Sequence, residues 1–304
     1  MSSHDAAPAW RAAGLSWSSG QAELKWRGPA GQERRSPLPV GAELALLVGA
    51  QRRCTGLWRS GRRLPCPFGA EVAPDSRAAV CPACERAGRA HSVATDTALD
   101  DPREFAVYLA HHGSAGLKVG ITAVQRGTAR LLEQGALASL LLVSCRLPAA
   151  RRTETLLSTV LGVPERISTP AKRRARLRPA PPVQRAADLL DAAGRAGAIA
   201  RPADGVPTGA GPADHTADYG LPAGGLRPVA AVLPLTPGQV LAGQVLCRIG
   251  PDVYLGTAAG PVLLDSRLLS GWALVRAAAD AAPSVGLAPI DRELDQEEEQ
   301  DALF

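Results

Sequence analysis

Apolar and polar residues alternate at both ends of the chain. Residues 15–48 contain the short alternating segments LSWSSGQAELKW and PLPVGAELALLV, broken by Gly and Pro. Residues 229–276 return to the same pattern with glycine turns between the segments. Alternation with a period of two predicts antiparallel strands, so we expect short strands at both ends.

The middle of the chain predicts the order strand, strand, helix, strand, helix. Apolar residues 105–112 and 117–122 flank GSAG, which has the length and chemistry of a hairpin turn. The segment RGTARLLEQGA predicts a short helix with Thr128 as its N-cap and Gly135 at its end. A buried strand, ASLLLVSCRL, and the helix PAARRTETLLSTVLG follow, and the helix is bounded by a proline and a glycine.

Helical spacing places a carboxylate on the apolar stripe of this second helix. Ala150, Glu154, Leu157 and Leu161 share one face, which should turn toward the sheet. An ionised carboxylate in that position needs a partner. The partner is either a metal ion or Arg151, one turn earlier.

In the hairpin, strand alternation gives Tyr108 and Lys118 a common face if Ala110 lies opposite Lys118. A slip of one residue would separate them. Gly120 on the same face leaves room beside Tyr108 for the backbone of a ligand.

The cysteine pattern predicts a metal site. No apolar run is long enough to cross a bilayer and the amino terminus lacks a secretory layout, so we expect a cytoplasmic protein with reduced cysteines. Four of the six are spaced C-x11-C-x14-C-x2-C, which suits a closed tetrahedral shell and hence a structural zinc ion: Cys54, Cys66, Cys81 and Cys84. His91 is the substitute ligand if Cys54 does not take part, and buried free thiols are the alternative. Cys145 and Cys247 lie in predicted strands and are expected in the core.

Charge is distributed unevenly. Residues 101–185 hold fourteen Lys and Arg against five Asp and Glu, whereas residues 291–304 hold seven acids and one arginine. Residues 166–178 carry six positive charges and no negative one. This suits the phosphates of a nucleic acid, and the alternative is a solvated arginine-rich face.

Two resemblances follow from these segments. CTGLW, PCP, CPAC and HSV, followed by VYLAHHGSAGLKVGIT and LLEQGA, resemble the bacterial domain of unknown function 2797, from about Gly14 to Trp272. The middle segment is similar to the GIY-YIG superfamily, whose core is a hairpin, an arginine-bearing helix, a strand and a glutamate-bearing helix. The resemblance implies an α+β fold: a small antiparallel sheet with flanking helices, combined with a zinc-stapled region and β segments from both ends.

In this resemblance AVY (106–108) takes the place of the first motif and KVG (118–120) that of the second. It implies that Tyr108 activates water, that Arg130, or else Arg126, stabilises the phosphoryl group, and that Glu154 holds Mg²⁺ or Mn²⁺. Lys118 stands where tyrosine is usual and would contact phosphate as a point charge. Ala106 replaces the usual glycine.

Two hypotheses follow: a metal-dependent nuclease, or a non-catalytic module of the same fold that binds nucleic acid or protein. In both, basic residues contact the nucleic-acid backbone, and we expect these to be Arg126, Arg151, Arg152, Lys172, Arg173, Arg174, Arg176 and Arg178.

The acidic tail ends in QDALF. Gln300, Leu303 and Phe304 fit a Q-x-x-L-F pattern that resembles the peptide by which bacterial replication and repair proteins bind the sliding clamp. The expected regions along the chain are a disordered 1–13, β and cysteine segments in 14–98, the α+β core in 99–195, a linker in 196–228, β segments in 229–280 and the tail in 281–304.

Overall fold

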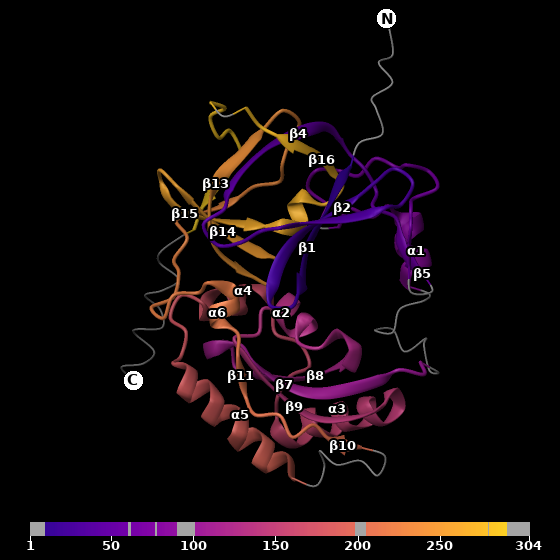
Figure 1. The fold of residues 1–304 in the computed structure, drawn as a ribbon, viewed down its shortest axis with the longest axis vertical. Helices are drawn as coiled ribbons and strands as arrows, with labels where there is room; N and C mark the ends of the chain where they lie inside the picture. The colour runs from indigo at the N-terminus through magenta and orange to yellow at the C-terminus, as the bar shows by residue number, and fades with distance from the viewer. Residues whose placement is uncertain are drawn as a thin grey trace, which may run out of the picture.

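The structure is a computed structural model that describes residues 10–59, 62–76, 78–89, 101–197, 205–278 and 280–290. It has an upper lobe of strands from both ends of the chain and a lower α+β lobe from the middle (Figure 1). Within these ranges, no helix is long and apolar enough to cross a membrane.

The upper lobe is one ten-stranded sheet in the order β17-β12-β15-β14-β13-β4-β16-β1-β2-β3. It is antiparallel except where β12 pairs with β15. Strands from the two ends alternate within it, because β4 lies between β13 and β16. The expected β segments of both ends therefore form a single unit. Its strands are β1 Arg11–Ser18, β2 Gln21–Arg27, β3 Glu33–Pro37, β4 Glu43–Arg52, β12 Ala230–Val232, β13 Val240–Ile249, β14 Asp252–Thr257, β15 Gly260–Asp265, β16 Trp272–Arg276 and β17 Leu287–Pro289.

The lower lobe is built on the predicted hairpin. β7 (Glu104–His111) lies between β8 (Leu117–Ala123) and β9 (Ala138–Arg146), and all three are antiparallel. Tyr108 lies opposite Gly120 and Ala110 opposite Lys118. This is the register that gives Tyr108 and Lys118 a common face.

The two faces of this sheet have different coverings. α3 (Leu147–Leu161) and α5 (Pro182–Ala196) cover one face, where they bury an aliphatic core with β7 and β9. The opposite face packs against α2 (Ala129–Gln134), which lies below the upper lobe (Figure 1). Left-handed glycines end α2 and α3, Gly135 and Gly162, as the sequence predicts.

The described part of the expected linker is structured. β10 (Val206–Pro207) and β11 (Ala213–Asp214) both pair with β9, and α6 (Thr216–Tyr219) follows. Tyr219 is completely buried, with its hydroxyl donating to Ala136 O at 2.8 Å. Strands of two residues carry no periodicity, so the sequence pattern could not mark them.

Candidate functional site

The four predicted cysteines lie together beside the upper lobe. They are brought there by the hairpin of β5 (Leu57–Arg59) and β6 (Arg62–Leu64) and by α1 (Pro82–Arg89), which begins within the CPAC segment. The Sγ atoms of Cys54, Cys66, Cys81 and Cys84 all lie within 4.8 Å of one another. Cys145 and Cys247 are buried in the two lobes, as expected.

The donor set fits a tetrahedral ion. Zn–S bonds of about 2.3 Å place ligand sulfurs about 3.8 Å apart, and Cys66 Sγ lies 3.9 Å from Cys81 Sγ. Cys54 Sγ accepts backbone N–H bonds from Gly56 and Cys81, which would stabilise a thiolate. Burial raises the pKa of the Cys84 thiol, so four thiolates in this space require a cation. Cys54 completes the group of four, and His91 lies outside the described residues.

A second site lies between the lobes. A cavity of about 1790 Å³ is bounded by β1 to β3 above and by the lower sheet, α2 and α3 below. Tyr108, Lys118, Arg130 and Glu154 all line it. The lining holds three glutamates in all, including Glu154, against nine basic residues: Lys25, Arg35, Arg103, Lys118, Arg126, Arg130, Arg151, Arg152 and Arg166.

Gln134 joins the tyrosine and the lysine at the floor of this cavity. Its Nε2 donates to the Tyr108 hydroxyl at 3.0 Å, and its Oε1 accepts from Lys118 Nζ at 3.0 Å. Lys118 Nζ also donates to Glu165 O at 3.1 Å. Because the hydroxyl of Tyr108 accepts from Gln134, its own O–H remains available to donate.

Burial shifts the pKa of both groups. Tyr108 is 1% exposed and Lys118 8% exposed. Burial raises the pKa of Tyr108, against the opposing effects of the Gln134 bond and of Arg130. Burial lowers the pKa of Lys118; Arg130 lowers it further, and Glu154 raises it. At neutral pH Tyr108 is therefore a neutral phenol, which can donate a hydrogen bond but cannot take a proton.

The space that we expected at Gly120 is filled by Tyr108 itself. A Cβ at Gly120 would lie 3.0 Å from Tyr108 Cε2 and closer still to the hydroxyl. Glycine is needed here because the phenol crosses the neighbouring strand, and no room is left for a ligand backbone.

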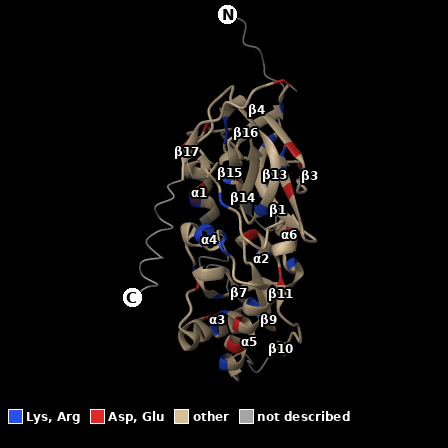
Figure 2. Ribbon diagram, turned by 90° about the vertical axis from the view of Figure 1, so that its left-hand side faces the viewer, with Lys and Arg blue, Asp and Glu red and all other residues tan. Residues whose placement is uncertain are grey.

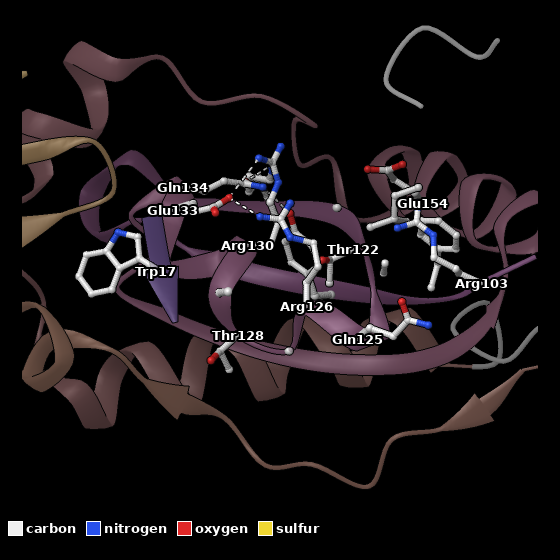
Figure 3. A pocket seen from close by; sticks show the side chains of 18 of the residues that line it. Trp17, Arg103, Thr122, Gln125, Arg126, Thr128, Arg130, Glu133, Gln134 and Glu154 are labelled. Atoms are coloured by element: carbon white, nitrogen blue, oxygen red, sulfur yellow. Dashed lines mark hydrogen bonds and ion pairs between the residues drawn. The ribbon is translucent and has the colours of Figure 1, made fainter. Parts of the chain in front are cut away.

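Two arginines of the cavity, Arg126 and Arg130, form ion pairs with Glu133. Arg126 Nη2 lies 2.6 Å from Glu133 Oε2 and Arg130 Nη1 lies 3.9 Å from the same oxygen. Figure 3 shows both guanidinium groups between Glu133 and Glu154. Glu154 is half-buried on α3, whose Ala150 and Leu157 are fully buried on the predicted apolar face.

Two buried hydroxyls line the cavity without a hydrogen-bond partner among the described residues. Thr122 Oγ1 belongs to β8, on the face that carries Lys118, and Ser16 Oγ belongs to β1. An unsatisfied buried hydroxyl is costly, so both are suited to bond a ligand or a water molecule in the cavity.

Part of the predicted basic interface is engaged within the fold. α4 (Thr169–Ala175) lies at the junction of the lobes (Figure 2). Arg173 and Arg176 bind the completely buried Asp252 at 2.5 and 2.6 Å. A buried carboxylate needs such partners, and so these two arginines join the lobes instead of facing a nucleic acid.

The remaining predicted contacts are divided between the cavity and its surroundings. Lys172 Nζ donates to Gln134 O at 3.0 Å, which ties α4 to α2. Arg174 and Arg178 are exposed on the α4 side. The others, Arg126, Arg151 and Arg152, line the cavity.

Sequence reasoning missed the residues that connect the site. Glu133 and Gln134 were assigned only to a short helix, although the i, i+3 spacing of Arg130 and Glu133 was a readable sign of an ion pair. The cavity contribution of Lys25 and Arg35 had no local signal, since β2 and β3 meet the lower lobe only through the tertiary fold. The terminal residues Gln300, Leu303 and Phe304 lie outside the described residues.

Comparison with known proteins gives one family. No curated protein and no solved structure matches the chain. The GIY-YIG resemblance is not among these findings and stays a prediction. A family model matches residues 43–274, which include the four cysteines and the whole lower lobe. The chain therefore belongs to the family described as "Protein of unknown function (DUF2797)".

Proposed function

We propose that the cavity between the lobes binds the sugar-phosphate backbone of a nucleic acid. The observation that carries this proposal is the excess of nine basic residues over three glutamates around one cavity. Such an excess attracts a polyanion and releases its counterions. The cavity of about 1790 Å³ also exceeds the range of about 300 to 1,000 Å³ that is usual for small-molecule pockets.

The lining favours contacts to phosphates over contacts to bases. The aromatic residues that line the described cavity are Trp17, Phe105 and Tyr108, and each is at most 4% exposed. Rings buried in this way are not free to stack on unpaired bases. Guanidinium groups and the unpartnered hydroxyls of Thr122 and Ser16 remain to contact phosphate oxygens.

Fluorescence anisotropy with labelled DNA tests this proposal. Arg152→Gln removes an exposed cation from the cavity and should weaken binding severalfold at low salt. Arg276→Gln, at an exposed position outside the cavity lining, is the matched control and should bind as the wild type does. Equal affinities for the two variants would reject the cavity as the binding site.

Phosphodiester cleavage at the same cavity is the second candidate. It is favoured because Tyr108, Lys118, Arg130 and Glu154, on four different elements, line one space. In this arrangement Arg130 would neutralise charge on the phosphoryl group, and the protonated Tyr108 would donate a hydrogen bond to it. Gln134 would hold Tyr108 and Lys118 in position.

Glu154 is the residue that would hold a divalent cation. A single carboxylate together with substrate phosphates is a usual environment for Mg²⁺, and the unpartnered hydroxyl of Thr122 lines the same cavity. A bound Mg²⁺ or Mn²⁺ ion would act as a Lewis acid on the phosphate.

Incubation with branched and single-stranded DNA or RNA, with Mg²⁺ or Mn²⁺, tests cleavage. Glu154→Gln should abolish product formation. Glu165 is an exposed glutamate of the same cavity, and Glu165→Gln should leave product formation unchanged. Product from Glu154→Gln equal to that of the wild type would leave the non-catalytic binding module as the function.

Two further assignments accompany this proposal. We propose that the ion held by the four cysteines is a structural zinc, because four thiolates leave no open position for a reacting water. We also propose that Gln300, Leu303 and Phe304 bind a sliding clamp. Deleting residues 300–304 should abolish clamp pull-down, and retained binding would remove that claim.

A further inference from the structure

Glu133 is an acidic residue in the lining of a basic cavity. It lies in the last turn of α2, its side chain is 26% exposed, and it lines the cavity beside the residues that we assign to phosphate binding. One of its carboxylate oxygens, Oε2, faces two guanidinium groups, those of Arg126 and Arg130. Figure 3 shows Glu133 beside Arg126 and Arg130, with dashed lines for the ion pairs.

A third cation, Lys25 of the opposite lobe, interacts electrostatically with the same carboxylate. Burial lowers the pKa of Lys25 on β2, and the negative charges of Glu33 and Glu133 oppose this effect. Glu133 is thus placed among basic groups from β2, from the turn before α2 and from α2 itself. These are elements of both walls of the cavity.

A carboxylate and a phosphate offer arginine the same kind of acceptor. Both present oxygens that carry negative charge to the N–H groups of a guanidinium, at similar distances. The separation of 2.6 Å between Arg126 Nη2 and Glu133 Oε2 is that of a short charge-assisted hydrogen bond. In the ligand-free protein, Glu133 therefore accepts a hydrogen bond from Arg126 and lies within ion-pair distance of Arg130, as a phosphate would in the complex.

We propose that Glu133 is an internal substitute for phosphate, which a nucleic-acid backbone must displace from Arg126 and Arg130 in order to bind. This inference rests on the proposed function and adds to it the residue that sets the affinity. The ion pairs are partly exposed, so each is weak enough to be exchanged. Glu133 thereby disfavours single or weakly held anions, since only a ligand that contacts several cations at once compensates for its displacement.

A positioning role for Glu133 would predict the opposite change in affinity when its charge is removed. If Glu133 instead positions Arg126 and Arg130 for the ligand, its neutralisation would release them and weaken binding. If it competes with the ligand, neutralisation strengthens binding. Glu133→Gln keeps the size of the side chain and removes only the charge, so the sign of the change distinguishes the two roles.

The matched control is Glu165→Gln. Glu165 is also a glutamate of the cavity lining, and its substitution removes one negative charge from the same space. Any general electrostatic gain appears in both variants. A gain that needs the contacts to Arg126 and Arg130 appears only in Glu133→Gln.

The experiment measures affinity for a short labelled DNA duplex over a range of salt concentrations. Glu133→Gln should bind about fivefold more tightly than Glu165→Gln at low salt, from the loss of two partly exposed ion pairs. Its plot of log affinity against log salt should be steeper, because salt screens the ion pairs of Glu133 in the wild type and so reduces the gain as the salt concentration rises. In the background of Arg126→Gln, this gain should be reduced.

The outcomes separate the role of Glu133 from the proposed binding of nucleic acid. If the wild type binds and Glu133→Gln is equal to the control or weaker, the substitute role is wrong while the binding site stands. If no form binds the duplex at low salt, the proposed function itself fails. Unchanged circular dichroism of the two variants shows that the comparison is between folded proteins.

Discussion

The phenol of Tyr108 lies across Gly120 on the neighbouring strand, in the space that any larger side chain would occupy. This contact places the hydroxyl beside Gln134, which in turn binds Lys118. One glycine in β8 therefore determines where the two polar groups of β7 and β8 point.

Gly120→Ala tests this relationship. The added Cβ overlaps a fully buried ring, so we expect a loss of about 1 to 3 kcal/mol in the free energy of unfolding. The variant should also lose affinity for nucleic acid, because Tyr108 and Lys118 must shift. The control is Gly194→Ala in α5, where a Cβ meets nothing within 4 Å and a small gain in stability is expected. Urea unfolding of both variants gives the comparison, and equal stabilities would contradict the packing described here.

Asp252 is the acidic residue whose substitution is expected to reduce the free energy of unfolding most. Asp252→Asn leaves the buried Arg176 without its counter-charge, while Arg173 keeps only its pair with Asp265, so we expect a loss of about 3 to 5 kcal/mol. Asp191→Asn removes an exposed pair with Arg195 and should cost less than about 1 kcal/mol. Thermal unfolding distinguishes them; a mild effect at Asp252 would show that α4 does not join the lobes.

The cysteine group predicts one bound zinc ion per chain. Cys81→Ser should lose the metal and make the region of β5, β6 and α1 sensitive to protease, since metal binding and folding are coupled there. Cys145→Ala removes a buried thiol of the lower lobe and should retain the metal. Elemental analysis of the purified variants measures this. Zinc retained in Cys81→Ser would exclude the four-thiolate shell.

Lys172 gives the stability a defined pH dependence. Burial, followed by the charges of Lys118 and Arg176, lowers the pKa of Lys172 from 10.5 to about 8. Between these two values the unfolded chain binds more protons at this residue than the folded one, so stability rises with pH across that window. Lys172→Met should show a smaller rise between pH 8 and pH 10. The difference between the two proteins isolates Lys172, because other lysines titrate in both. Identical pH profiles would contradict the lowered pKa.

The parts of the fold set by local sequence could be predicted. Alternation predicted the hairpin but left its register open, and the structure places Ala110 opposite Lys118. Helical spacing placed Glu154 on the apolar face of α3, where it is half-buried, and the glycines at 135 and 162 end their helices as predicted. The cysteine spacing indicated the metal group because chelation restricts the geometry so strongly.

Features that depend on the meeting of distant segments could not be predicted. The basic run 166–178 suggested an exposed surface, since nothing in its own sequence shows that Asp252 lies buried opposite Arg173 and Arg176. The same holds for Gly120, whose neighbour proved to be Tyr108 and not a ligand. Glu133 and Gln134 acquire their roles only when α2 is packed against the hairpin.

The salt dependence of DNA binding tests the central claim most directly. The account predicts that the wild type binds DNA with a steep dependence on salt, and that combined Arg130→Gln and Arg152→Gln reduces the slope of log affinity against log salt by about two. The control Arg276→Gln should leave the slope unchanged. A slope that is unaffected by the two cavity substitutions, or an absence of binding at low salt, would contradict the assignment of this cavity to a nucleic-acid backbone.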